Sequence, residues 1–513
     1  MTVTSLPARR APARAPRVAP RNMARLLRVE LRHNAMPVVL PVIAVLFWFD
    51  SYRIAATLPP LWVVRLYYIL GQGHALIDFA PFVAGVAAWM GSRDGRRGMG
   101  DLVTATVRPR WEARLATWAA TVVWAVGPYL VCMAVTLALL GRPIAWGGPP
   151  WWPVAAAAAG VAAFASLGFT LGACLPNRFI APIAAFGAVF AMGTSSQIGF
   201  GASGGWALIL PTMSNGNFGQ DAGIFYQFLP DLPIARLMFL AGIAVAAAGL
   251  LGLPATAGGP QLRRAAAVVT GTGAAAAVTA IALAFTAQVG PYGTVIPALH
   301  DAASDRPVRY APVCDHAGIP VCVQPAYRPY LSDATAALGP VISQVSGLPG
   351  APVRASQAAA VFASGPAVTA GPAGVGQIAT LKGSPPVLYL PLGAIALPNS
   401  FGADTATFIS QLKVEAVHAL VTSGAASGNP AQQAVEAALL QNAGIPLAAQ
   451  PDALGDTPWP LPSENGPLAS AYPPPIAAAA QRFAALPAAA RHAWLAGHLG
   501  ALRAGRFPLA RLP

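Results

Sequence analysis

Two side chains inside an apolar stretch of this sequence have the type and spacing to do chemistry. His74 and Asp78 lie four residues apart in GQGHALIDF. On a helix, this spacing puts an imidazole and a carboxylate on one face, where they could hydrogen-bond to each other. Ionisable groups in a membrane-like setting often mark a substrate or ion pathway. The pair either lines such a pathway or faces the outer membrane interface, and the sequence leaves both open.

Glu415 and His418 form a second pair, in Val-Glu-Ala-Val-His at 414–418. On a helix they share a face, as in the H-E-x-x-H motif of zinc proteases. Val414 stands where that motif has its first His, so one imidazole ligand is missing. We expect an ordinary amphipathic helix and no metal site. A degenerate protease-like domain retained for binding is the alternative.

Cys314 and Cys322 are eight residues apart in a polar, Pro-rich stretch, with His316 between them. A structural zinc site takes four ligands, more than these residues supply. We therefore expect a disulfide that closes a small loop, which requires an oxidising compartment.

The motif that ATP-hydrolysing chains use to bind phosphates, G-x-x-x-x-G-K-S/T, is missing. The two lysines of the chain, Lys382 and Lys413, are followed by Gly and Val. We expect no catalytic residue and no cofactor in this chain, so any coupling to ATP would need a partner.

These residues lie in a chain whose composition is typical of a membrane protein. Of its 513 residues, 55% are hydrophobic and only 10% are charged, whereas about a quarter of the residues in soluble domains are charged. The sequence predicts seven helices of membrane-spanning length. They cover roughly residues 36–50, 69–90, 115–140, 154–175, 180–200, 235–253 and 265–287.

The arginines are distributed unevenly around these segments. If the N-terminus is cytoplasmic, the segments on its side carry seventeen Arg and the opposite segments before residue 235 carry three. This positive-inside bias places residue 288 onward outside, where the disulfide could form. The net charge of +14 then reflects topology. Nucleic acid is not an expected partner, because the Arg clusters flank apolar segments and lack interleaved aromatic residues.

Composition divides the chain into five parts. The tail, residues 1–22, is predicted to be disordered, basic and cytoplasmic. Residues 23–34 are predicted to form an interfacial elbow helix with its Arg side chains at the headgroups. Six spans, a seventh span and an α+β extracytoplasmic domain follow. The parts are residues 1–22, 23–34, 35–264, 265–288 and 289–513. In the last part, residues 385–398 predict a strand, and 405–421, 431–444 and 487–505 predict helices.

The connection between the second and third spans is the most densely charged. Gly98 permits a sharp turn, and Asp101 could N-cap a short helix starting at Leu102. The connection is either a positive stop signal that holds topology or a docking element that receives force from a cytoplasmic motor. Its candidate residues are Arg93, Asp94, Arg96, Arg97, Gly98, Asp101, Thr106, Arg108, Arg110, Glu112 and Arg114.

This connection resembles the first cytoplasmic loop of the type-2 (ABC-2-like) family of ABC exporter permeases. The positions that carry the resemblance are Asp94, Gly98, Asp101-Leu102, Thr106 and Arg110. MARLLRVELRH at 23–33 is similar to the family's elbow helix, and the resemblance covers residues 23–253, the six-span core. The sequence departs from the family pattern at Asp94, where Glu is usual, and at Met99, where Thr is usual.

The resemblance implies a multi-pass permease subunit of a bacterial plasma membrane. Its partners would be separate ATP-binding subunits, a second copy or a related permease, and membrane lipid. The seventh span and the extracytoplasmic domain lie outside the family's basic plan. They resemble an extension seen in some actinobacterial-type permeases, with its Cys pair and a final stretch here at Trp494 to Arg503.

An exporter permease is therefore the leading hypothesis for function. The alternatives are a membrane-anchored enzyme and a ligand-binding receptor, in which the extracytoplasmic domain would carry the activity. Neither the transported substrate nor the direction of transport follows from the sequence.

Overall fold

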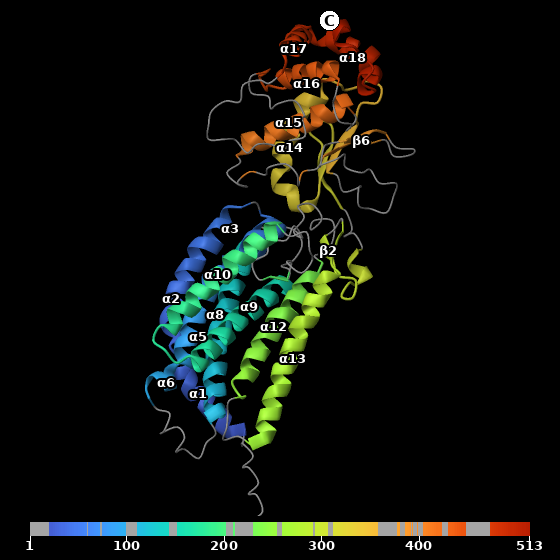
Figure 1. The fold of residues 1–513 in the computed structure, drawn as a ribbon. Coiled ribbons are helices and arrows are strands. Elements are labelled where there is room, and N and C mark those ends of the chain that lie inside the picture. The colour runs from blue at the N-terminus through green and yellow to red at the C-terminus, as the bar shows by residue number, and fades with distance from the viewer. Residues whose placement is uncertain are drawn as a thin grey trace, which may run out of the picture.

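The fold is known from a computed structural model, in which a bundle of long helices carries a smaller mixed domain at one end (Figure 1). The structure describes residues 20–58, 60–71, 74–98, 110–142, 151–201, 209–210, 229–253, 259–290, 293–305, 311–357, 377–379, 385–390, 392, 398, 404–422, 429–447 and 472–513.

The long helices form where the sequence is apolar and nearly free of charge. In lipid, a backbone that bonds to itself along a helix leaves few polar groups without a partner. Six helices among the described residues are long and apolar enough to cross a membrane. They are Met36–Thr57, Tyr68–Gly91, Trp111–Gly141, Trp151–Cys174, Asp231–Leu250 and Pro260–Phe285.

The bundle also contains short helices at its ends and two π-helical turns, η1 and η2. In chain order its elements are α1 (Pro20–Arg32), α2 (Met36–Phe47), η1 (Trp48–Tyr52), α3 (Arg53–Thr57), α4 (Trp62–Leu66), η2 (Tyr67–Gly71), α5 (His74–Gly91), α6 (Arg93–Arg96), α8 (Arg110–Gly141), α9 (Trp151–Cys174), α10 (Ile180–Gly201), α12 (Asp231–Leu250) and α13 (Gly259–Phe285).

The sequence predicts seven spans, and α10 is the helix that falls short. It is helical over Ile180–Gly201, but its described apolar stretch covers only Ile180–Ser195. The side chains of residues 196–200 lie outside the described part of the chain. The described part of the chain thus shows six candidate spans and one shorter apolar helix.

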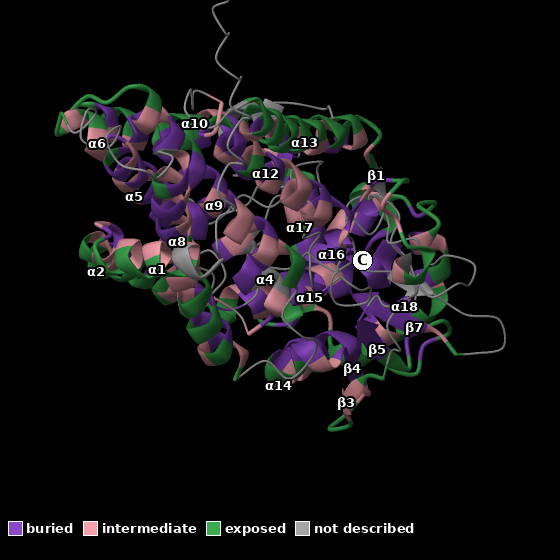
Figure 2. Cartoon of the chain, turned by 90° about the horizontal axis from the view of Figure 1, so that it is seen from below, coloured by how far each residue is buried: buried purple, intermediate pink, exposed green. Residues whose placement is uncertain are grey.

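Helices α5 and α9 form the buried centre of the bundle. A Cβ atom added at Gly168 or Gly172 of α9 would clash with the carbonyl oxygens of Ala84 and Ala88 on α5. Small residues thus let the two backbones approach closely, as is common between membrane helices. Within an apolar 18-residue stretch of each candidate span, 59% and 61% of residues are buried in the second and fourth spans, against 22% in the first and 17% in the last. The peripheral α13 accordingly shows mostly exposed residues (Figure 2).

The C-terminal domain (residues 311–513) is built on a five-stranded mixed sheet with the order β3-β4-β5-β7-β6. Strands β4, β5 and β7 run parallel, and β3 and β6 are antiparallel edges. Helix α14 connects β4 to β5, since parallel neighbours need a crossover. The strands are β3 (Val313–Asp315), β4 (Val321–Val323), β5 (Arg354–Gln357), β6 (Gln377–Ala379) and β7 (Val387–Leu390). A separate pair, β1 (Gln288–Gly290) and β2 (Gly293–Val295), follows α13.

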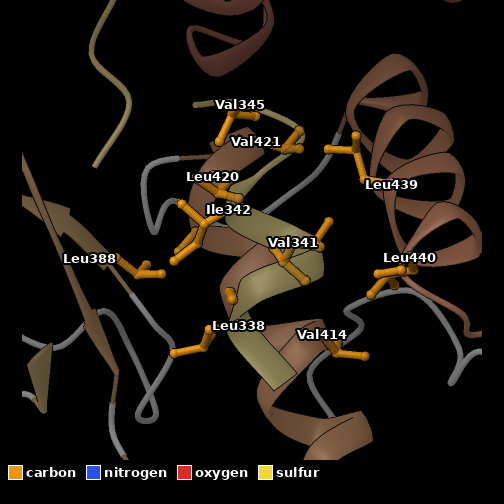
Figure 3. Packing of buried hydrophobic residues seen from close by; sticks show 14 of the residues in the cluster. Leu338, Val341, Ile342, Val345, Leu388, Val414, Leu420, Val421, Leu439 and Leu440 are labelled. Atoms are coloured by element: carbon orange, nitrogen blue, oxygen red, sulfur yellow. The ribbon is translucent and has the colours of Figure 1, made fainter. Parts of the chain in front are cut away.

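Helices of this domain share one hydrophobic core with the sheet. They are α14 (Leu331–Ile342), α15 (Thr405–Thr422), α16 (Pro430–Asn442), α17 (Pro474–Ala485) and α18 (Ala488–Arg503). Side chains of α14, α15, α16 and β7 meet in this core (Figure 3).

The predicted helices at 405–421, 431–444 and 487–505 are confirmed as α15, α16 and α18. Gly444, with φ +89°, ends α16 as expected. Within the predicted strand at 385–398, β7 covers Val387–Leu390, and residues 391 and 393–397 lie outside the described residues. The prediction that α15 is amphipathic is wrong, because α14, α16 and strands of the sheet contact it and bury most of its residues.

Candidate functional site

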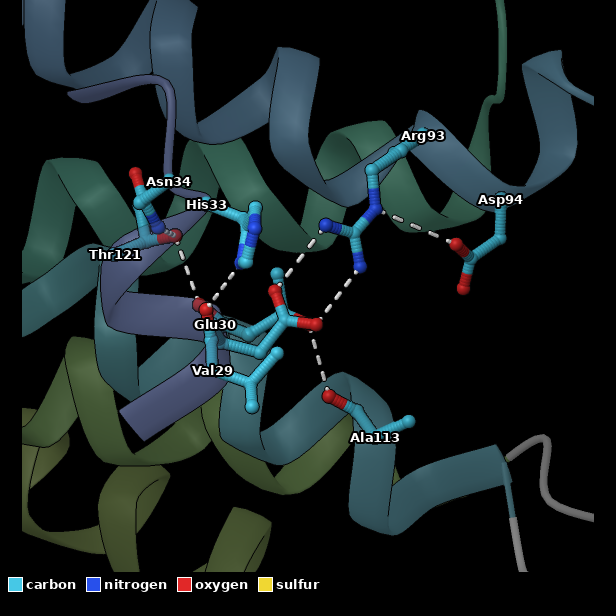
Figure 4. Close-up of polar contacts among 9 residues, drawn as sticks. Val29, Glu30, His33, Asn34, Arg93, Asp94, Ala113 and Thr121 are labelled. Carbon is cyan, nitrogen blue, oxygen red and sulfur yellow. Dashed lines mark hydrogen bonds and ion pairs between the residues drawn. The ribbon is translucent and has the colours of Figure 1, made fainter. Parts of the chain in front are cut away.

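At the end of the bundle far from the C-terminal domain, α1 is joined to α6 by an ion pair between Glu30 and Arg93. The Arg93 Nη2 and Nη1 atoms donate to Glu30 Oε1 and Oε2 at 3.0 and 3.2 Å (Figure 4). The Arg93 and Glu30 side chains are only 25% and 16% exposed. Burial lowers the pKa of Arg93, but the contacts with Glu30 and Asp94 outweigh this and raise it overall. We call this ion pair the α1 clamp.

Helix α1 is also held by α8, which contains the third candidate span. The Trp124 indole donates to the Leu31 carbonyl at 2.8 Å, and the Asn34 amide donates to Thr121 Oγ1 at 3.0 Å. The other Asn34 side-chain atom, Oδ1, accepts from the Met36 N–H at 2.9 Å, where α2 begins. These contacts and the α1 clamp connect α1 and the turn after it to the first three candidate spans.

The other residues predicted for the charged connection take different roles. Arg96 Nε donates to Ser92 Oγ at 2.9 Å and its Nη2 to the Trp89 carbonyl at 3.0 Å, while the guanidinium lies 3.3 Å from the centroid of the Trp89 ring. Arg96 therefore caps the end of α5. Arg97 is exposed, and Gly98, with φ +63°, makes the expected sharp turn.

The rest of the connection is described only at its far side, where α8 begins at Arg110. Glu112 is buried and Arg114 is half-buried in the first turns of this helix. The predicted helix after Asp101, together with Thr106 and Arg108, lies outside the described residues, as does the side chain of Arg110.

At the opposite end, next to the C-terminal domain, His74 and Asp78 each contact the first candidate span. His74 Nδ1 lies 2.8 Å from Asp50 Oδ2, and Ser51 Oγ donates to Asp78 Oδ2 at 2.9 Å. The Tyr68 ring stacks on the His74 ring with centroids 4.3 Å apart. We call these five residues the polar cluster. It joins the first two candidate spans through side chains whose partners are distant in the sequence.

The two π-helical turns carry three members of the polar cluster. Asp50 and Ser51 lie in η1, and Tyr68 lies in η2. A π-helical turn inserts an extra residue into an α-helix, rotates the following side chains and is frequent at functional sites. The sequence analysis missed these residues because it ended the first span at Asp50, whereas the helical segment continues to Thr57. Asp50 is tolerated inside it because His74 contacts its carboxylate.

The polar cluster combines two carboxylates with one imidazole. Such a set can accept and release protons. Among the residues that the structure describes, no group of three or more His, Cys, Asp or Glu side chains could hold a metal ion. Proton exchange is therefore the chemistry that this arrangement offers.

In the C-terminal domain, Cys314 and Cys322 form the expected disulfide. They lie directly opposite each other on the antiparallel strands β3 and β4, with Cα atoms 4.1 Å apart. The bond pins the edge strand to the sheet.

The predicted His418 is a buried structural residue of the same domain. Its Nδ1 lies 3.0 Å from Glu436 Oε1 on α16, and its Nε2 lies 3.3 Å from Thr422 Oγ1. The His418 and Glu436 side chains are 3% and 2% exposed. Burial raises the pKa of Glu436, and the contact with His418 opposes this shift. Val414, at the position of the missing ligand, packs in the hydrophobic core (Figure 3).

The chain matches no protein-family model, no curated protein and no solved structure. With no relative to indicate a function, the geometry at the two ends of the bundle has to indicate it.

Proposed function

We propose that this chain is the membrane permease subunit of an exporter that is driven by a separate ATP-binding subunit. The observation that carries the proposal is the α1 clamp. Because Glu30 and Arg93 join α1 to the start of the charged connection, a push on that connection would reach three candidate spans together. A segment that served only as a positive stop signal would not need the α1 clamp.

The proposed topology has seven spans, with α10 as the fifth, and a cytoplasmic N-terminus in a bacterial plasma membrane. Seventeen arginines then lie on the cytoplasmic side and three on the other side of the first six spans. The Cys314–Cys322 disulfide supports an extracytoplasmic C-terminal domain, since such bonds persist in oxidising compartments. The α1 clamp then faces the cytoplasm, where ATP is available.

In this proposal the polar cluster lies on the translocation path near its outer end. Two copies of the chain, or one copy and a related permease, enclose the path, and ATP-driven closure of the partner subunits switches it between two states. Asp50, with its side chain 43% exposed, is the member of the cluster best placed to meet a substrate.

Among the residues of the C-terminal domain that the structure describes, nothing favours an enzyme as a second candidate. The His–Glu pair described there, His418 and Glu436, is buried in the core, where no substrate would reach it.

Photo-crosslinking in cells tests the proposal at Arg97, which is exposed beside the α1 clamp. A photoreactive residue at Arg97 should capture an ATP-binding protein. The matched control is the same residue at Val353, which is exposed in the C-terminal domain and should not capture it. Equal capture at both positions, or capture of no ATP-binding protein at Arg97, would refute the proposed coupling.

A further inference from the structure

The connection between the first two candidate spans packs against the C-terminal domain as well as against the bundle. Leu61 lies in this connection, is 2% exposed, and belongs to the same buried cluster as Leu338 of α14 and Leu412 of α15. A residue from the bundle therefore completes the core of the domain. Removing the domain from this place would expose Leu61 to water.

Arg65 fixes the same connection to the third candidate span. It is 6% exposed, and its Nη1 donates to the Leu140 carbonyl at 2.7 Å in the last turn of α8. Its Nε and Nη2 donate to the Leu58 carbonyl at 3.2 and 3.1 Å. Carbonyls in the last turn of a helix have no helical partner, so the guanidinium satisfies one of them. Trp62 of α4 packs against Gly141, where an added Cβ would lie 2.9 Å from the Trp62 ring.

Tyr330 brings the C-terminal domain to the same point. It is 6% exposed and stands directly before α14. Burial raises the pKa of its hydroxyl, and the nearby charge of Arg65 opposes this shift. Burial likewise lowers the pKa of Arg65, opposed by Tyr330 and Tyr52. The ring centroids of Tyr330 and of Phe408 on α15 lie 5.9 Å apart, and both side chains belong to the same buried cluster as Leu61.

The polar cluster begins where this connection ends. Helix α4 ends at Leu66, η2 starts at the next residue, and Tyr68 within η2 stacks on His74. Leu66 is fully buried in the bundle core, which leaves α4 and η2 little room to move independently. A shift of α4 would therefore change the position of the Tyr68 and His74 rings relative to Asp50.

We propose that the C-terminal domain regulates the polar cluster by acting as a latch on α4. With the domain seated on Leu61, Arg65 holds α4 and η2 in the position that pairs His74 with Asp50. When the domain moves away, α4 is released and the pair separates. The consequence for transport rests on the proposed function, but the latch itself is a property of this chain alone.

Hydrogen exchange of the full-length protein in lipid nanodiscs tests the latch. The variants are Leu61→Asn, which disfavours burial of the connection in the domain, and Arg65→Met, which keeps an unbranched apolar side chain and removes the guanidinium with its hydrogen bonds. Both should make the amides between Leu66 and Phe79 exchange about tenfold faster or more. In Arg65→Met the hydrogen bonds of the guanidinium to the Leu140 and Leu58 carbonyls are lost, and in Leu61→Asn the connection loses its packing in the core of the domain. The control is Ile54→Ala at an exposed position of α3, which should leave exchange there unchanged.

Arg65→Met keeps the test decisive if Leu61→Asn unfolds the C-terminal domain. Wild-type exchange between Leu66 and Phe79 in a folded Arg65→Met protein would overturn the latch. The measurement needs neither ATP nor substrate. Faster exchange in the variants, together with a crosslink at Arg97 that captures no ATP-binding protein, would therefore refute the proposed function and keep the latch. Capture of an ATP-binding protein at Arg97, together with unchanged exchange in the variants, would refute the latch and keep the proposed function.

Discussion

Removing one charge of the α1 clamp should loosen α1 from the bundle. Two charge-assisted hydrogen bonds of 3.0 and 3.2 Å join Glu30 to Arg93. A hydrogen bond to a charged group contributes roughly 1.5–3 kcal/mol, whereas an exposed ion pair contributes roughly 0.2–1 kcal/mol. Because both side chains are mostly buried, we expect Glu30→Gln to cost about 2 kcal/mol of docking free energy, which is roughly a 30-fold change in equilibrium.

Hydrogen exchange of residues 20–34 in the full-length protein measures this change. Glu30→Gln and Arg93→Gln should each speed exchange of α1 by about 30-fold. The double variant should be no faster than either single variant, because each removes the same interaction. The matched control is Asp94→Asn, which removes only the longer ion pair of 3.6 Å between Arg93 Nε and Asp94 Oδ1 and leaves both Glu30–Arg93 hydrogen bonds in place.

Additive effects in the double variant would refute this reasoning, because they would mean that Glu30 and Arg93 act independently. A coupling free energy below about 0.5 kcal/mol, the range of exposed pairs, would likewise show that the α1 clamp transmits no force.

Three further outcomes follow from the other sites. His418→Ala leaves the Glu436 carboxyl buried without its imidazole, so the C-terminal domain should lose about 3 kcal/mol of unfolding free energy. Burial raises the pKa of Glu436. Thermal melts of this variant should therefore show the greatest stability at low pH, where the carboxyl is protonated, and a loss of stability as the pH rises through the raised pKa. Adding Glu436→Gln should abolish that loss. Replacing Cys314 and Cys322 by Ser should lower the unfolding free energy by about 2.5 kcal/mol, and an equal melting temperature in the reduced and oxidised wild type would contradict this. Asp78→Asn should reduce transport at an unchanged expression level, and full transport would remove Asp78 from the mechanism.

The sequence was sufficient for features that depend on local pattern. Apolar length predicted the long helices, and α15, α16 and α18 followed from helical periodicity. The spacing of Cys314 and Cys322 predicted their disulfide. His74 and Asp78 were found because ionisable residues are conspicuous in an apolar segment.

Features that depend on contacts between distant segments could not be predicted in this way. Glu30 is the partner of Arg93, and its signal was a single acidic residue within an otherwise basic helix. Glu436 similarly stands as a lone charge in α16, and only the packing of α15 on α16 pairs it with His418. Leu61 gave no signal, because any connection can contain one leucine.

The sheet of the C-terminal domain was beyond sequence pattern for another reason. Its strands are three or four residues long, too short to show the alternation that identifies a strand. Only β7 was anticipated, because its residues fall in the apolar run at 385–398.

The central claim is that this chain converts ATP hydrolysis by a partner into movement of its helices. ATP turnover by the captured ATP-binding protein, measured alone and after reconstitution with the full-length chain in liposomes, tests it most directly. The account predicts that the wild-type chain stimulates turnover and that Glu30→Gln weakens this stimulation, while Asp94→Asn does not. Turnover that is the same with and without the wild-type chain would contradict the account.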